Sequence, residues 1–159
     1  MKRSSVGHFS CSIARGLDIV GEWWTLLVLR DVFMGVRRFE AIQADLGIAR
    51  NVLSDRLTTL VDHGVLERRR YQDHPERHEY VLTEMGRDLA PVLIELMRWG
   101  DRWLSPEGAP MVLLHRACGQ PVTWGEPCEH CGVPVDADAL RLVKGPGWRA
   151  PGVTPATVA

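Results

Sequence analysis

The residue types best suited to chemistry gather towards the C-terminal end of the chain. His115 and Cys118 are separated by two residues, and Cys128 and Cys131 repeat this spacing. A glycine follows each pair, and a tight turn that aims two side chains at one ion needs the backbone freedom of glycine. A closed set of four nitrogen and sulfur ligands is typical of a structural tetrahedral zinc site. The spacing therefore predicts zinc bound by His115, Cys118, Cys128 and Cys131.

Other uses of these residues stay open. Cys128 and Cys131 form a C-x-x-C pair, which thiol redox proteins also use. His130 competes with His115 as the fourth ligand, although a ligand inside the second pair would strain its turn. A catalytic zinc is not expected, because four protein ligands leave no open coordination position. The cysteine-bearing segment is too small to bury a core, so a metal would supply its folding free energy.

Composition and absent motifs narrow the function further. The chain has 159 residues, of which 45% are hydrophobic and 25% charged, as in ordinary globular proteins. Its net charge is −1, so any binding to DNA must depend on local charge. No phosphate loop, G-x-S-x-G or H-E-x-x-H motif is present, and we do not expect an enzyme. No apolar run reaches the ~20 residues that span a bilayer, and no secretory signal opens the sequence. We expect a cytoplasmic protein with no membrane partner.

Apolar spacing predicts the elements that precede the cysteines. Leu53, Leu57 and Leu60 mark one face of a helix, and similar patterns recur upstream. Short strands joined by a polar turn follow, and then a long helix that begins after the N-cap Thr83 and is kinked or split by Pro91. The expected helices cover residues 11–20, 22–34, 38–45, 49–63 and 84–104, and the strands 65–71 and 78–82.

This order predicts a mainly α fold with a small β-hairpin wing, a winged helix-turn-helix. The 49–63 helix would enter the major groove, where Asn51 could pair with adenine, while the hairpin lays arginines along the backbone. Residues 37–77 carry almost as many acidic as basic residues, so a solvated surface with ion pairs is the alternative. The expected DNA contacts are Arg37, Arg38, Arg50, Asn51, Ser54, Asp55, Arg56, Thr58, Arg68, Arg70, Arg77 and His78.

Four segments together resemble the HxlR-type bacterial transcription regulators: CSIARGLDIVGEWWTLLVLR from Cys11, RRFE from Arg37, NVLSDRL from Asn51 and RHEYVLTEMG from Arg77. The resemblance covers residues 9–104 and implies a dimeric winged-helix regulator that binds short inverted repeats in double-stranded DNA. The sequence departs from the family at Ala49, where a Ser or Thr often caps the recognition helix; a missing cap typically costs ~1 kcal/mol.

The resemblance also draws attention to Cys11, because some members use a cysteine at this position to sense oxidants or electrophiles. Arg15 lies one helical turn away and would favour the thiolate. The alternative is a small buried residue that packs a dimer interface. A seam of apolar residues on the 84–104 helix predicts that interface, although Trp99 and Trp103 could instead sandwich a flat small molecule. The seam consists of Met85, Leu89, Val92, Leu96, Trp99 and Trp103.

These features predict two domains. Residues 1–104 form the winged helix-turn-helix and dimerisation domain, 105–110 a linker, 111–144 a zinc-ribbon-like unit and 145–159 a flexible tail. The predicted function is a homodimeric, sequence-specific transcriptional regulator, a repressor, that responds to a thiol-reactive or small-molecule signal. The alternatives are a zinc-ribbon protein-interaction module and a thiol redox protein that uses Cys128 and Cys131.

Overall fold

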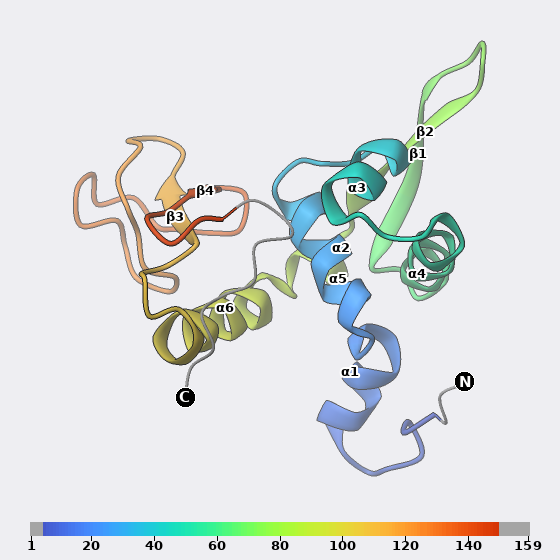
Figure 1. Cartoon of the computed structure of the whole chain (residues 1–159), viewed down its shortest axis with the longest axis horizontal. Helices are drawn as coiled ribbons and strands as arrows, with labels where there is room; N and C mark the ends of the chain where they lie inside the picture. Colours follow the sequence, from blue (N-terminus) through green and yellow to red (C-terminus); the bar gives the residue numbers. More distant parts are fainter. Residues whose placement is uncertain (1–4, 150–159) are drawn as a thin grey trace. The chain divides into compact units, whose positions relative to one another are not determined.

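A computed structural model of the chain describes residues 5–149 (Figure 1). The chain divides into two compact units, Met1–Leu89 and Ala90–Ala159, and each is described by itself. This division falls before the 90–104 helix, so that helix is grouped with the cysteine-bearing segment, whereas the sequence analysis placed it in the first domain. None of the described helices is long and apolar enough to cross a membrane.

The first unit contains the predicted elements in the predicted order, which confirms the winged helix-turn-helix fold. Four helices come first, and a two-stranded antiparallel hairpin and a single helical turn follow. The elements are α1 (Ser12–Val20), α2 (Trp23–Phe33), α3 (Phe39–Leu46), α4 (Arg50–Asp62), β1 (Leu66–Gln72), β2 (Arg77–Leu82) and α5 (Glu84–Arg87).

The core of the first unit lies around α2, which packs against α3 and α4. Its buried face carries Val28, Leu29 and Val32, and the leucine stripe of α4 is also buried, as its spacing predicts. Burying one such side chain contributes roughly 1.5–3 kcal/mol to stability. The core is completed by Ile42, Ile48, Leu53, Leu57, Leu60, Val65 and Leu66.

One acidic side chain is buried in this core. Asp31 of α2 is fully inaccessible, and its Oδ1 accepts hydrogen bonds from Arg30 Nε and Nη2 at 3.1 and 2.6 Å. Asp31 Oδ2 has no hydrogen-bond partner among the described residues. Burial disfavours the charged form and raises the pKa of Asp31 to about 6, against the opposing effect of Arg30.

The hairpin formed by β1 and β2 is the wing, which projects away from the helices (Figure 1). Arg68 lies opposite Tyr80, and Arg70 lies opposite His78. Residues directly opposite each other share one face of an antiparallel pair, so these four side chains lie on the same face. The chain before α3 is joined to the wing, because the Tyr80 N–H donates to the Arg37 carbonyl at 2.8 Å.

The long helix expected over 84–104 is divided in two, as Pro91 predicts. Helix α5 ends at Arg87, and α6 (Ala90–Leu104) begins three residues later. A proline has no N–H to continue the helical ladder, and its ring clashes with the carbonyl four residues earlier, here that of Arg87. The Thr83 hydroxyl accepts from the Gly86 N–H at 3.1 Å, so the predicted N-cap is confirmed.

The second unit contains α6 and an antiparallel pair of strands, β3 (Met111–His115) and β4 (Leu140–Lys144). This strand pair was not expected from the sequence, and its two strands are separated by the cysteine-bearing loops. Part of the expected linker and the start of the expected tail are hydrogen-bonded together, from the Gly145 N–H to the Pro110 carbonyl at 2.9 Å. The rest of the expected tail, residues 150–159, lies outside the described residues.

Candidate nucleic-acid interface and metal centre

Helix α4 presents one polar face to solvent. Asn51, Ser54, Asp55 and Thr58 are all exposed, and they lie on the side of the helix away from the buried leucines. The helix begins at Arg50, so Asn51 stands in its first turn. Its N-cap, Ala49, makes no side-chain hydrogen bond, which leaves the first N–H groups without the partner that a Ser or Thr would supply.

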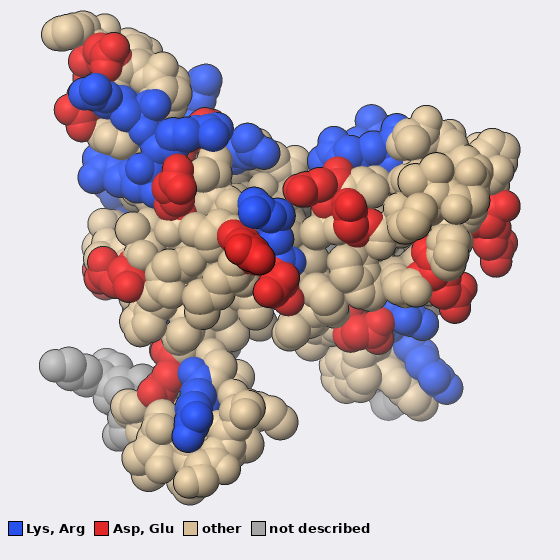
Figure 2. Space-filling model, turned by 180° about the vertical axis from the view of Figure 1, so that it is seen from behind, with Lys and Arg blue, Asp and Glu red and all other residues tan. Residues whose placement is uncertain are grey.

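Arginines gather on the wing, where Figure 2 shows basic side chains over the hairpin with acidic ones beside them. Arg68, Arg70 and Arg77 are exposed, as are Arg37 and Arg38 before α3. Arg70 Nε lies 3.1 Å from Asp73 Oδ1. Because exposed ion pairs are worth little, this pair leaves Arg70 available to an anion.

Two of the expected DNA contacts are less accessible than the others. Arg56 of α4 and His78 of β2 are half-buried, and Arg56 Nε is buried without a hydrogen-bond partner among the described residues. His78 lies between two charged neighbours, with Nδ1 3.0 Å from Arg68 Nη2 and Nε2 3.2 Å from Glu76 Oε1. These positions favour Arg50 over Arg56 as a side chain that reaches a partner.

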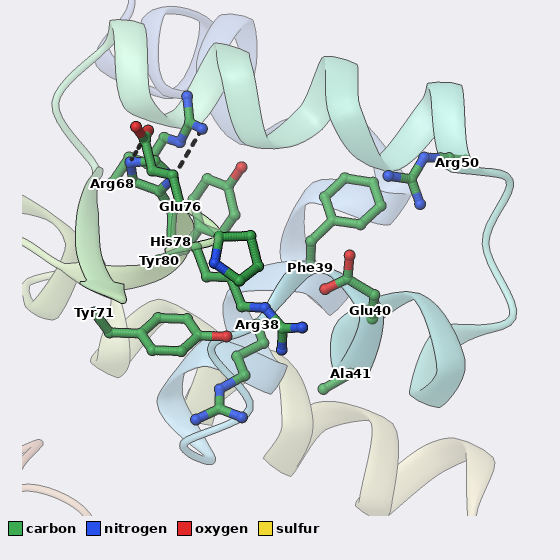
Figure 3. A pocket seen from close by; sticks show the side chains of 12 residues that line it. Arg38, Phe39, Glu40, Ala41, Arg50, Arg68, Tyr71, Glu76, His78 and Tyr80 are labelled. Atoms are coloured by element: carbon green, nitrogen blue, oxygen red, sulfur yellow. Dashed lines mark hydrogen bonds and ion pairs between the residues drawn. The ribbon is translucent and has the colours of Figure 1, made fainter. Parts of the chain in front are cut away.

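Aromatic side chains that the sequence analysis did not single out hold two of the arginines. The Arg38 guanidinium lies over the Tyr71 ring, 4.5 Å from its centroid, and that of Arg50 lies 4.7 Å from the centroid of Phe39 (Figure 3). Such contacts orient a cation and leave its N–H edge available. The alternation of residues along β1 and β2 could have placed Tyr80 beside Arg68, but Tyr71 lies at an irregularity of the pairing, between Arg70 and Gln72.

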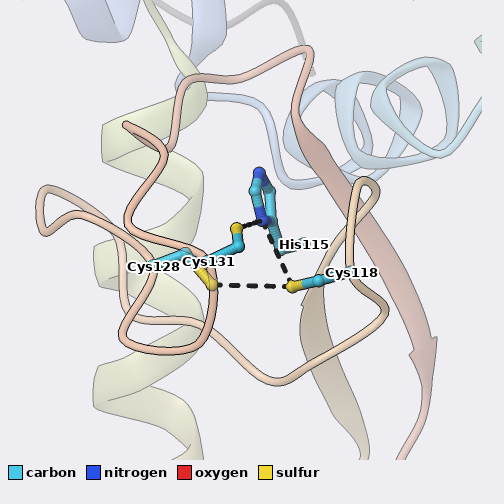
Figure 4. A group of neighbouring side chains, drawn as sticks. All are labelled: His115, Cys118, Cys128 and Cys131. Atoms are coloured by element: carbon cyan, nitrogen blue, oxygen red, sulfur yellow. Dashed lines mark hydrogen bonds between the residues drawn. The ribbon is translucent and has the colours of Figure 1, made fainter.

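The structure brings together the four predicted metal ligands (Figure 4). His115 Nδ1 lies 3.4 Å from Cys118 Sγ and 3.2 Å from Cys131 Sγ, and the sulfurs of Cys118 and Cys128 are 3.6 Å apart. A tetrahedral zinc ion with ordinary bond lengths separates its ligand atoms by about 3.6–3.8 Å. The four atoms lie close enough together to hold one metal ion, whereas His130 is exposed and is not part of the cluster.

The two turns of the cluster share one backbone geometry. The N–H of Gly119 donates to the His115 carbonyl and that of Gly132 to the Cys128 carbonyl, each at 2.7 Å. Both glycines adopt positive φ, 70° and 72°, which other residues rarely adopt. The Cys131 N–H donates towards Cys128 Sγ and, with a similar bond from His130, lowers the pKa of Cys128 to about 6 although burial opposes it. All four cysteines of the chain are free thiols.

Large apolar side chains remain exposed on both units. In the first unit, Ile13 of α1 and Trp23 of α2 are 73% and 81% exposed, and Cys11 at the start of α1 is also exposed. In the second unit, four residues of the predicted seam lie exposed on α6: Val92, Leu96, Trp99 and Trp103. Of the remaining seam residues, Met85 is exposed on α5. Leu89 is half-buried and lies in the segment of the chain that connects α5 to α6.

Comparisons with known proteins agree with this geometry. An uncharacterized HTH-type transcriptional regulator of Mycobacterium tuberculosis, Rv3095, is 48% identical over 140 residues, which cover 87% of this chain and 89% of that protein. The crystal structure of PA1607, a putative transcription factor, matches with a TM-score of 0.70 and 36% identity, and covers 89% of this chain and 100% of that one. The redox regulator HypR in its oxidized form matches 58% of this chain and 96% of that one, with a TM-score of 0.55 and 29% identity.

The family assignment follows from the sequence and the fold together. The sequence profile described as HxlR-like helix-turn-helix matches residues 19–108, which is more than half of the chain and covers α2 to α6 together with the wing. The chain therefore belongs to the HxlR-like helix-turn-helix family of DNA-binding transcriptional regulators.

Proposed function

We propose that the protein is a homodimeric repressor that binds an inverted-repeat operator through α4 and the wing. The exposed polar face of α4 beside an arginine-bearing wing is the observation that carries this proposal. A helix in the major groove can reach base edges, and cations on a neighbouring hairpin neutralise phosphates. A repressor needs only to occupy its operator, so transcription of the target is expected to rise when the protein is absent.

The residues divide into two roles. Asn51 is exposed in the first turn of α4, where its amide can pair with the N6 and N7 atoms of adenine. Arg77 is exposed at the start of β2 and would contact phosphate, which carries no sequence information. The other expected contacts on α4 and the wing have the same two roles: base reading by Ser54, Asp55 and Thr58, and phosphate binding by the arginines.

A second copy of the chain is the proposed partner of the exposed apolar surfaces. Val92, Leu96, Trp99 and Trp103 form a stripe on α6 with spacings of four and three residues. Such a stripe is typical of a helix that packs against another helix. A dimer would also place two copies of α4 on the two halves of a palindromic site.

Binding to the DNA upstream of the protein's own gene tests the proposal. Asn51→Ala is expected to relax base preference at one position of each half-site and to cost about 1–3 kcal/mol for the specific sequence. Arg77→Ala is expected to weaken all sequences alike and to lower the salt slope by about 1. Arg98→Ala on α6, an arginine paired with Glu95, is the control. Unchanged binding by both test variants would contradict the assignment of α4 and the wing.

We also propose that the Cys/His cluster holds one structural zinc ion per chain. Four nitrogen and sulfur atoms that all lie within 4.8 Å of one another support this, as do the two matching glycine turns. A zinc ion bound there would supply folding free energy to the second unit. Metal analysis of protein purified without chelator tests it, and protein without bound metal would favour the thiol redox alternative.

The exposed thiol of Cys11 is the proposed sensor of oxidants or electrophiles. The similarity to a protein described as a redox regulator supports this role. Treatment with diamide is expected to change the DNA affinity of the wild type but not of Cys11→Ser. An equal response of both proteins would exclude Cys11 as the sensor.

A further inference from the structure

We propose that the cleft between α3, the start of α4 and the wing binds a small aromatic acid, and that this ligand competes with DNA. The competition rests on the proposed DNA contacts, because the cleft and those contacts share arginines. Binding of the acid itself can be measured without DNA, so the two proposals can fail separately.

The cleft has the size of a small-molecule site. Its volume is about 750 Å³, within the range of roughly 300–1,000 Å³ found for such sites. Three rings line it, and they come from different elements: Phe39 from α3, Tyr71 from β1 and Tyr80 from β2 (Figure 3). With Pro75 at the wing turn, they offer apolar surface to a planar group.

Positive charge exceeds negative charge in the cleft. Arg38, Arg50, Arg68 and Arg77 line it, against two acids, Glu40 and Glu76. Glu76 is engaged by His78, which also contacts Arg68. Arg38, Arg50 and Arg77 form no ion pair with a carboxylate within residues 5–149. They are therefore available to an anion.

Two of these arginines are already oriented. Stacking of Arg38 on Tyr71 and of Arg50 on Phe39 restricts long side chains that otherwise lose much rotamer entropy on binding. A guanidinium that lies over a ring still has N–H groups that are not directed at the ring, and a carboxylate can accept two of them. The cleft therefore holds bidentate donors in place beside ring faces.

The combination of rings and cations defines the ligand class. Phosphates of DNA need cations but gain little from apolar ring surface, whereas a neutral aromatic compound would leave the arginines unpaired. A planar ring that carries a carboxylate matches both features. Because Arg38, Arg50, Arg68 and Arg77 are also proposed to contact DNA, an acid bound to them would weaken DNA binding, as an inducer does.

Calorimetric titration of the full chain with 2-naphthoate, without DNA, tests the cleft. We expect saturable binding of one molecule per chain, and binding about tenfold weaker or more for the neutral analogue 2-naphthalenemethanol, since a charge-assisted hydrogen bond is worth ~1.5–3 kcal/mol. Arg38→Gln and Tyr71→Leu are expected to lose most of the affinity. Arg70→Gln is the matched control, because Arg70 lies on the same wing but does not line the cleft.

The outcomes separate the parts of the proposal. Absence of saturable binding, or wild-type affinity in both cleft variants with unchanged circular dichroism, would overturn it; in the second case the acid binds elsewhere, such as the apolar face of α6. Competition is tested by adding 2-naphthoate to the protein–DNA complex, where the apparent DNA affinity of the wild type is expected to fall. Unchanged DNA affinity at saturating acid would overturn the competition. If the protein binds no operator DNA, the proposed function is wrong, and the calorimetric titration still shows whether the cleft binds the acid.

Discussion

The two units of the chain bury different kinds of side chain. In the first unit the largest fully buried side chains are aliphatic, such as Leu29, Ile42 and Leu57. In the second unit His115 is the only described residue among the largest fully buried side chains, and it belongs to the metal cluster. The first unit is therefore stabilised by an apolar core, whereas the second buries fewer apolar side chains, among them Ile94, Leu113 and Leu140, beside the Cys/His cluster that we propose to hold zinc.

Because the two units bury different side chains, substitutions are expected to destabilise them in different ways. An apolar core loses stability in steps, because each truncation removes part of the buried surface and leaves a cavity. A metal-dependent unit loses its structure as a whole when one ligand is lost, because the binding free energy is its folding free energy.

Removal of the proposed zinc ion is expected to have the largest effect. A strong chelator, or Cys128→Ser, is expected to unfold residues 111–144 while the first unit stays folded, since apparent binding free energies of structural zinc are ~10–16 kcal/mol. Hydrogen exchange measured segment by segment checks this. His130→Ala is the matched control, because His130 lies between Cys128 and Cys131 but outside the cluster. Simultaneous loss of protection from hydrogen exchange in both units would contradict the prediction that only the second unit depends on the metal.

Truncation of the first core is expected to have the next largest effect. Leu57→Ala removes a side chain that is 1% exposed, and comparable substitutions cost about 2–5 kcal/mol. Urea unfolding is expected to show this loss while metal content stays at the wild-type value. Val61→Ala, a half-buried position on the same helix, is expected to cost less. An equal loss of unfolding free energy at both positions would show that the leucine stripe does not contribute more to the core than the half-buried positions do.

The buried carboxyl of Asp31 is expected to make the first unit pH-dependent. Its pKa is raised from 3.8 to about 6, so the folded state holds the proton more tightly than the unfolded state. The resulting stability is complete below pH 4 and is lost as the pH rises through 6, by up to about 3 kcal/mol. Asp31→Asn is expected to lack this decline when urea unfolding is compared between pH 4 and 7. Asp62→Asn controls for the change in net charge, and parallel curves for Asp31→Asn and the wild type would refute the prediction.

The cap of α4 is expected to have the smallest effect. Ala49 has extended backbone angles, φ −62° and ψ 137°, and no capping side chain. Ala49→Ser is expected to stabilise the first unit by about 1 kcal/mol, because its hydroxyl can accept an N–H of the first turn. Thermal unfolding measures the gain, and Ala49→Val, which cannot cap, is the control. A gain with valine equal to that with serine would exclude capping as the cause.

Much of this architecture could be predicted from local patterns in the sequence. The leucine spacing of α4, the cap at Thr83 and the break at Pro91 depend on residues within one or two helical turns of one another. The grouping of His115, Cys118, Cys128 and Cys131 was also predicted, since two equal spacings with following glycines describe two tight turns. The preference for His115 over His130 followed from strain in such a turn, and the structure brings His115 into the cluster.

The unpredicted features depend on residues that are distant in sequence. The pairing of Leu140–Lys144 with Met111–His115 joins segments that are separated by the cysteine loops. The burial of Asp31 could not be inferred either, because an acidic residue on an apolar helix is ordinarily placed on its exposed side. The cleft was also missed, because the bulge between Arg70 and Gln72 moves Tyr71 out of simple alternation and towards Arg38.

Most helices, the wing, the family and the grouping of His115, Cys118, Cys128 and Cys131 were predicted from the sequence, because periodicity, capping and turn chemistry act between neighbours in the chain. Only the tertiary structure decided which arginines lie on rings, which carboxyl is buried and that the cysteine loops are closed by a strand pair. Those features depend on contacts between separate elements, and many arrangements of such contacts are compatible with the same local patterns. The distances between the four atoms of the Cys/His cluster depend on the local sequence and on the tertiary structure. Each turn sets the distance within one pair, and the fold of the second unit brings the two pairs together.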